Sequence, residues 1–124
     1  MKLTDHFDSD EFRCKCGNAD CTQKPMDVAF VARLEGARKL AGVPFAIQSG
    51  YRCPEYNATL KGAVEDSAHT KAMAADVACN GSGERYDIVS GALLAGFRRI
   101  GIGKTFVHLD TDPEKPQDVI WLYK

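Results

Sequence analysis

The sequence lacks an excess of charge of one sign, a long hydrophobic run and an apolar leader. Lysine and arginine total 16 against 17 aspartates and glutamates, a formal net charge of −1, so a broad basic face for nucleic acid is not expected. No apolar run approaches the roughly 20 residues that cross a bilayer, and residues 1–12 carry charges where a signal peptide needs an apolar core. We therefore expect a protein that is made in the cytoplasm without a signal peptide, binds no nucleic acid and does not insert into membranes. We also expect a monomer, although no feature of the sequence specifies the oligomeric state.

The five cysteines cannot all pair with one another, which argues against a complete disulfide framework. Cys14, Cys16 and Cys21 are close in sequence, and the other two stand apart. One interpretation is a structural zinc held by the three clustered thiolates, with Cys53 or His6 as the fourth ligand. The other interpretation, which the unusual Cys-x-Cys-x4-Cys spacing favours, is a set of reduced thiols in a cytosolic protein.

The 124 residues, 44% hydrophobic and 27% charged, fit one globular domain. We expect a single domain over residues 1–124, in which 1–24 form an irregular, cysteine-containing lead-in. Stretches of β-forming residues predict short strands within 43–50, 72–80, 100–112 and 119–124. Together with two helices they predict an α+β fold with a small, mainly antiparallel sheet.

Helical spacing of apolar residues predicts the two main helices that flank this sheet. The first covers 25–42, with Pro25 in its first turn and Gly42 at its end. The second covers 85–97 after a turn at 80–84, and its apolar face would consist of Tyr86, Val89, Leu93 and Phe97. Residues 54–69 are expected to form a long loop, and ordered loops of that length usually carry function.

The segment SAHTKAMAAD places His69 and Asp76 seven positions apart among alanines. The apolar neighbours of Asp76 should bury its carboxylate, which is costly unless the charge is paired or bound to a metal. In FVHLD, strand alternation puts His108 and Asp110 on one face. Two imidazoles and one carboxylate could hold a catalytic zinc, which lowers the pKa of a bound water to about 7. The alternative is a buried ion pair between Asp76 and an arginine such as Arg52 or Arg98.

Several stretches together resemble the zinc D-Ala-D-Ala carboxypeptidase family: HFDSDEFRCKCG, SGYR, Asn57, SAHTKAMAAD and FVHLD. That family includes bacterial carboxypeptidases and dipeptidases, and phage endolysins that cut L-alanyl-D-glutamate bonds. The resemblance covers most of the chain and implies a small single-domain member with the family's hedgehog and DD-peptidase type of fold. It also implies one catalytic Zn²⁺ held by His69, Asp76 and His108.

The resemblance further assigns roles toward the substrate. Arg52 would bind a carbonyl or carboxylate of the substrate and stabilise the oxyanion, because a guanidinium presents a planar fork of donors. Without the resemblance, Arg52 would be interpreted as a surface or structural arginine that pairs with an acid such as Glu55 or Asp66. Ser67 would orient the site or the substrate, and otherwise it would be an ordinary turn serine.

The chain departs from the family pattern at two positions. Ala72 stands where the pattern has glycine, and its methyl group needs slightly more room. Thr105 stands three residues before the last histidine, where many members carry the glutamate that acts as general base. Asp110 is the best substitute as a catalytic proton acceptor, or else it orients a ligand imidazole. Asp66 and Glu65 are weaker candidates for the base.

These features predict a zinc-dependent metallopeptidase that hydrolyses a peptide bond in peptidoglycan stem peptides or cross-links. The bond would be that of a D,D-carboxypeptidase or endopeptidase, or of an L-alanyl-D-glutamate endopeptidase. Such a protein would reach the cell wall as a released phage lysin or with a virion. The alternative is a zinc-stabilised phage structural or wall-binding module that has lost the general base, and a cytosolic D-Ala-D-Ala dipeptidase is a third interpretation.

Overall fold

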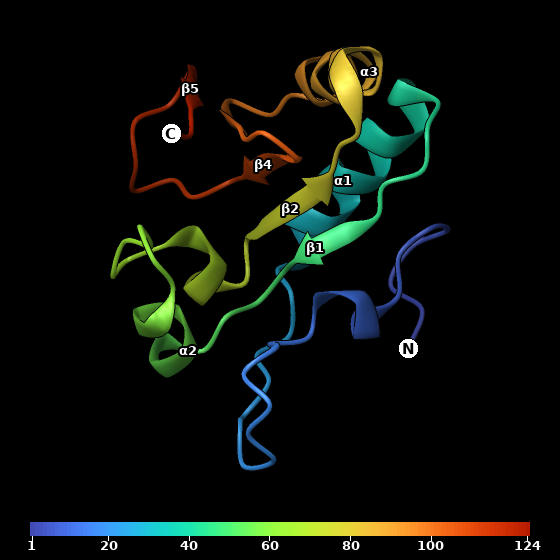
Figure 1. Ribbon diagram of the computed structural model, residues 1–124. Coiled ribbons are helices and arrows are strands. Elements are labelled where there is room, and N and C mark those ends of the chain that lie inside the picture. The colour runs from blue at the N-terminus through green and yellow to red at the C-terminus, as the bar shows by residue number, and fades with distance from the viewer.

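The computed structural model describes residues 1–124, which form a five-stranded sheet with two long helices packed on one face (Figure 1). The strands are β1 (Ile47–Ser49), β2 (Ala74–Ala78), β3 (Arg99–Ile102), β4 (Phe106–Asp110) and β5 (Val119–Leu122). Their order in the sheet is β1-β2-β4-β3-β5. Only the β3–β5 pair is parallel, so the expected α+β class with a mainly antiparallel sheet is confirmed.

The helices are the 3-10 turns η1 (Ser9–Phe12) and η2 (Ala68–Lys71), the short α2 (Pro54–Thr59), and the long α1 (Val28–Ala41) and α3 (Gly81–Leu94). The predicted long loop at 54–69 was therefore wrong, because it contains α2 and the start of η2. Pro54 occupies the first turn of α2, where its missing N–H costs no hydrogen bond.

Helix α1 begins three residues later than predicted. The side chain of Asp27 accepts the backbone N–H of Phe30 at 2.9 Å and caps the helix. Pro25 therefore lies before the cap instead of in the first turn. Gly42 ends the helix as expected, with a left-handed φ of 72°.

Helix α3 differs from the prediction in its start and in its buried face. The expected turn at 80–84 is the helix's first turn, and of the expected apolar face Tyr86 is 74% exposed and Leu93 52% exposed. Within the helix the buried residues are instead Ile88, Gly91 and Ala92, whereas Val89 packs against the core and Phe97 is buried in it as expected. A Cβ on Gly91 would lie 2.5 Å from the carbonyl oxygen of Ala37. The missing side chain thus lets α3 pack directly on α1, which turns the larger residues outward.

One face of the sheet packs against the hydrophobic core, and the other face carries polar side chains. Alternate residues of the central strands, such as Val77, Ile100, Val107 and Leu109, pack with α1 and α3 in the main hydrophobic cluster. Strand alternation therefore turns the intervening residues of β2 and β4 to the face away from the two long helices.

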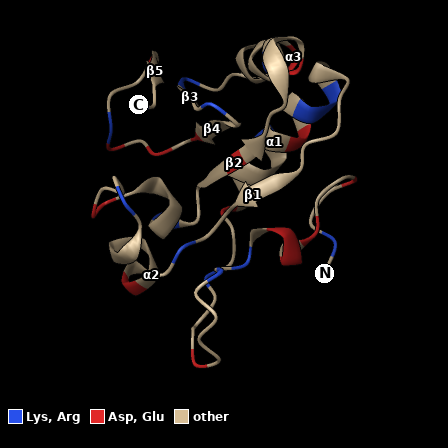
Figure 2. Cartoon of the chain, in the orientation of Figure 1, with Lys and Arg blue, Asp and Glu red and all other residues tan.

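None of the helices is long and apolar enough to cross a bilayer. Basic and acidic residues are both distributed over most of the chain, and neither sign is confined to one element (Figure 2).

Candidate metal centre

One row of residues crosses the sheet on the face away from α1 and α3. In the strand registers, Ser49 is opposite Asp76, Asp76 opposite His108, His108 opposite Gly101, and Gly101 opposite Trp121. Directly opposed residues of neighbouring strands bring their side chains together. The antiparallel pairing of β2 and β4 thus places Asp76 beside His108, although 31 residues separate them in the sequence.

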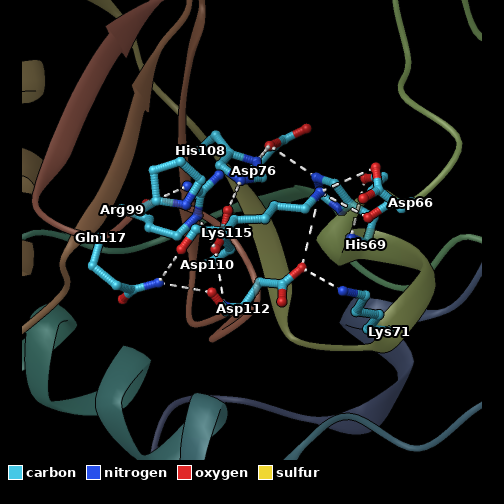
Figure 3. A network of polar contacts seen from close by, with 12 residues as sticks. Asp66, His69, Lys71, Asp76, Arg99, His108, Asp110, Asp112, Lys115 and Gln117 are labelled. Carbon is cyan, nitrogen blue, oxygen red and sulfur yellow. Dashed lines mark hydrogen bonds and ion pairs between the residues drawn. The ribbon is translucent and has the colours of Figure 1, made fainter.

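The third member of the cluster, His69, comes from η2, immediately before β2. One potential ligand atom from each of His69, Asp76 and His108 lies within 4.8 Å of those of the other two. His108 Nδ1 is 2.9 Å and His69 Nε2 is 3.3 Å from the same oxygen, Asp76 Oδ1. All three residues are buried. Figure 3 shows that they lie inside a larger network of polar side chains.

The outer nitrogen of each imidazole has a hydrogen-bond acceptor. His69 Nδ1 is 2.7 Å from the carbonyl oxygen of Gly50, and His108 Nε2 is 2.6 Å from Asp110 Oδ2. A proton on each outer nitrogen leaves His69 Nε2 and His108 Nδ1 as the lone-pair atoms that face Asp76. Metal-binding histidines in proteins are oriented in this way by a carbonyl or carboxylate behind the ring.

One further observation indicates that these three residues suit a zinc ion. His69 Nε2 is fully buried and makes no hydrogen bond, despite its proximity to Asp76. Buried polar atoms without a partner are rare in folded proteins and call for an explanation. Two imidazole nitrogens and one carboxylate oxygen are a ligand set of catalytic zinc sites, which keep a fourth position open. A cation between the three side chains would satisfy His69 Nε2.

The pKa shifts keep two of the three groups in the form that binds metal. Burial lowers the pKa of His69, which keeps its imidazole neutral. Burial alone would raise the pKa of Asp76, but His108 and His69 hold it well below its usual range, so the carboxylate is ionised. Burial likewise opposes the charged form of His108, yet the adjacent Asp110 and Asp76 raise its pKa.

Arg52 shares Asp76 with the histidines. Its Nη2 is 3.3 Å from Asp76 Oδ2, whereas the histidines face Oδ1. Ser49 Oγ accepts from Arg52 Nε at 3.1 Å, and Asn57 Oδ1 accepts from Nη1 at 3.2 Å. Both interpretations of Asp76 are thus present together, since one oxygen faces the cation position and the other the guanidinium. The acids named as alternative partners of Arg52, Glu55 and Asp66, are not among its contacts. Arg98, the other arginine named for Asp76, pairs with Asp118 instead.

Both oxygens of Asp110 already have partners (Figure 3). Oδ1 accepts from Arg99 Nε at 2.7 Å and from the backbone N–H of Asp112 at 3.0 Å, and Oδ2 faces His108. Asp110 is only 1% exposed. Burial would raise its pKa, but His108 foremost, with Asp112 and Arg99, lowers it, so the carboxylate is ionised. These contacts favour the orienting alternative for Asp110 over that of general base.

The two remaining positions of the ligand segment have local roles. Ser67 Oγ accepts the backbone N–H of His69 at 3.2 Å and caps η2, which holds the histidine in place. Ala72 has a left-handed φ of 58°, a region that glycine enters without strain. The position at which the family pattern has glycine therefore requires a left-handed backbone conformation. The expectation that Ala72 needs only slightly more room was incomplete.

A pocket of about 940 Å³ lies over the cluster. Its lining includes residues that were not singled out from the sequence: Lys61, Arg99, Phe106, Lys115, Trp121, Tyr123 and Lys124. The ring of Trp121 lies 5.5 Å and that of Tyr123 6.2 Å from the ring of His108, centroid to centroid. A Cβ on Gly101 would lie 2.5 Å from the Tyr123 ring and 2.8 Å from that of Trp121. Gly101 of β3 was thus a signal that aromatic rings lie close over this strand.

The comparison with protein families identifies the relatives of this chain. The family model of peptidase M15 matches residues 5–110, which include all three residues of the cluster. The chain belongs to the peptidase M15 family. This confirms the resemblance described above. M15 peptidases are zinc-dependent and act on peptidoglycan peptides. No curated protein gives a significant match.

Proposed function

We propose that this M15 family member is a zinc-dependent peptidase that hydrolyses a peptide bond in peptidoglycan stem peptides or cross-links. The observation that carries the proposal is the His69, Asp76 and His108 cluster, whose unpartnered His69 Nε2 lies at a pocket large enough for a short peptide. A buried ligand set with an adjacent pocket is what metal-assisted hydrolysis requires.

The chemistry of the pocket suits an anionic peptide. Five lysines and arginines line it against three aspartates: Arg52, Lys61, Arg99, Lys115 and Lys124 against Asp66, Asp76 and Asp110. Lys61 and Lys124 have no side-chain acid partner, so both ammonium groups are available to substrate carboxylates. Stem peptides supply such carboxylates at their D-residues, and the aromatic rings of Trp121 and Tyr123 offer an apolar surface for their methyl groups.

Each polar side chain has a distinct task in this proposal. Zinc, when bound, would supply Lewis-acid polarisation and water of lowered pKa. Ser49 and Asn57 hold the guanidinium of Arg52 in place, so that its donors can meet the oxygen on which negative charge develops. Asp110 keeps the Nε2 proton of His108 in place, which leaves Nδ1 as the ligand atom.

The proton acceptor is a separate question, because Asp110 is enclosed by its partners. Of the three pocket carboxylates, Asp76 and Asp110 are committed to the cluster, which leaves Asp66. Its side chain is 77% exposed, and Oδ1 is 3.6 Å from Lys115 Nζ. It precedes the ligand segment directly in sequence. We propose that Asp66 takes the proton from the attacking water and passes it to the leaving amine.

The test is hydrolysis of purified peptidoglycan and of free D-Ala-D-Ala with zinc added. The variants are His108→Ala, Asp110→Ala, Asp66→Asn and, as a control far from the cluster, the surface substitution Asp118→Asn. We expect His108→Ala to abolish activity and zinc binding at the cluster. Asp66→Asn should lower kcat about 10²–10⁴-fold without loss of zinc, and Asp118→Asn should behave as wild type.

The products decide among the bonds and the rival functions. Mass spectrometry of the fragments separates carboxypeptidase, D,D-endopeptidase and L-alanyl-D-glutamate endopeptidase cleavage, the last of which would fit a phage lysin. Cleavage of free dipeptide but not of wall would select the dipeptidase. A zinc-loaded wild type as inert as His108→Ala would refute the enzyme and leave the structural or wall-binding module.

A further inference from the structure

A second cluster of metal-ligand side chains lies outside the peptidase site. The thiols of Cys14, Cys16, Cys21 and Cys53 converge, with all four sulfurs within 4.8 Å of one another. None of the four forms a disulfide. Cys14 and Cys53 are buried, and the two others are partly buried against the same small apolar cluster. His6, the other ligand considered for this site, is held by Glu35 instead, with Nδ1 2.6 Å from Oε2.

The spacing of the sulfurs is that of a tetrahedral thiolate site. Cys14 Sγ lies 3.6 Å from Cys53 Sγ, and four sulfurs about 2.3 Å from a central zinc are about 3.8 Å apart. A set of four sulfurs at this spacing with no cation would crowd four groups that ionise to like charges. Tetrahedral sulfur sites of this type hold zinc in structural roles, with no position left open.

The backbone around the cluster supports the sulfurs from outside. The N–H of Cys53 points to Cys14 Sγ at 3.3 Å, and the N–H of Asn18 points to Cys16 Sγ at 3.4 Å. The side-chain amide of Gln23 donates to Cys21 Sγ at 3.4 Å. Such donors stabilise negative charge on sulfur and orient the ligands, as outer groups do at other metal sites.

We propose that Cys14, Cys16, Cys21 and Cys53 bind a structural zinc ion, separate from the catalytic one. The position of Cys53 gives this site its purpose. Cys53 follows Arg52 directly, and the cluster therefore ties the N-terminal lead-in to the segment that carries both the guanidinium and the Gly50 carbonyl behind His69. The backbone N–H of Tyr51, between them, also donates to the carbonyl oxygen of Phe12 at 2.9 Å. The zinc would fix the fold of the lead-in and the placement of Arg52.

The test counts metal on protein purified under reducing conditions and freed of excess zinc by dialysis. We expect two zinc ions in the wild-type chain and one in the His69→Ala/His108→Ala double variant. One is also expected in Cys16→Ser/Cys21→Ser, and two in the control Cys79→Ala, which removes the one cysteine outside the cluster. Cobalt in place of zinc should give thiolate-to-cobalt charge-transfer absorption in the wild type and the histidine variant, and none in the double serine variant.

If the double serine variant does not fold, the His69→Ala/His108→Ala variant still tests the thiolate site by itself. A folded histidine variant without zinc, without the cobalt absorption and with freely reactive thiols would overturn the thiolate site. A Cys14–Cys53 disulfide found by mass spectrometry of the purified wild type would overturn it as well. None of these readouts depends on peptidase activity, so failure of the enzyme proposal is distinguishable from failure of this one.

Discussion

Asp110→Asn separates the two roles that the sequence left open for this residue. The amide oxygen can still accept the Nε2 proton of His108, but the substitution removes the negative charge that stands 2.6 Å behind the imidazole. Outer-sphere partners of metal ligands typically contribute 10- to 100-fold in metal affinity, or about 1.4–2.7 kcal/mol. We therefore expect a zinc dissociation constant raised by about that factor, with kcat near the wild-type value once zinc is saturating.

The same substitution weakens the fold, and the structure bounds that effect. Arg99 loses a buried carboxylate partner at 2.7 Å but keeps the carbonyl oxygen of Pro116. A fully broken buried ion pair costs about 3–5 kcal/mol, and we expect the loss in unfolding free energy to be smaller than that. Urea unfolding measures it, and the activity assays are run where the variant is folded.

Zinc titration by competition with a chelator, followed by kcat at full zinc occupancy, distinguishes the roles. A kcat that stays about 10²–10⁴-fold low at saturating zinc would refute the orienting role and restore Asp110 as general base. The exposed pair of Asp118 with Arg98, whose atoms lie 2.7 Å apart, provides the matched control, because Asp118→Asn makes the same chemical change without touching His108.

Three further substitutions test other parts of the fold. Gly91→Ala places a Cβ 2.5 Å from the carbonyl oxygen of Ala37, and we expect urea unfolding to show a loss of about 1–3 kcal/mol; an unchanged midpoint would contradict direct helix contact. Gly101→Ala should displace the Trp121 ring, and the fluorescence of this single tryptophan should change. The increase in KM, expressed as a free energy, should exceed the loss in unfolding free energy. Glu35→Gln tests pH dependence. Burial would raise the pKa of Glu35, but hydrogen bonds from the N-terminal segment lower it overall. Its stabilising effect should therefore be full above its ordinary pKa of about 4.3 and vanish as pH falls through the lower folded value. A difference between wild type and variant that persists at the acid end would refute this.

The strands that carry the cluster were predictable because their sequence is locally decisive. AADVA and FVHLD are short apolar runs, and alternation within FVHLD separates Val107 and Leu109 from His108. Both strands were found where expected. Grouping His69 with Asp76 and His108 required the family pattern, since spacing alone did not distinguish a metal site from a buried ion pair.

What the sequence did not reveal depends on contacts between distant segments. The buried face of α3 was misjudged because Gly91 and Ala92, poor in apolar area, are the residues that meet α1. The aromatic wall was missed because β5 pairs in parallel with β3, and only that register sets Trp121 over Gly101. The sequence named both Cys53 and His6 as possible fourth members of the thiol cluster, and only the tertiary contact between Cys14 and Cys53, 39 residues apart, decides for Cys53.

The sheet explains how so small a chain can hold a charged cluster without losing its core. On the face toward α1 and α3, Val77, Val107 and Leu109 are fully buried among apolar residues. On the other face, Asp76 and His108 lie between arginines that neutralise their surroundings, Arg52 at one side and Arg99, through Asp110, at the other. Buried charges are costly unless they are paired, and these are paired. The imidazole of His69 is neutral, but its Nε2 is a buried polar atom of the cluster left without a hydrogen-bond partner. A cation bound there would satisfy this atom, so removal of zinc by a chelator should lower the melting temperature of the wild type but not that of His69→Ala/His108→Ala under conditions that leave the thiolate site loaded.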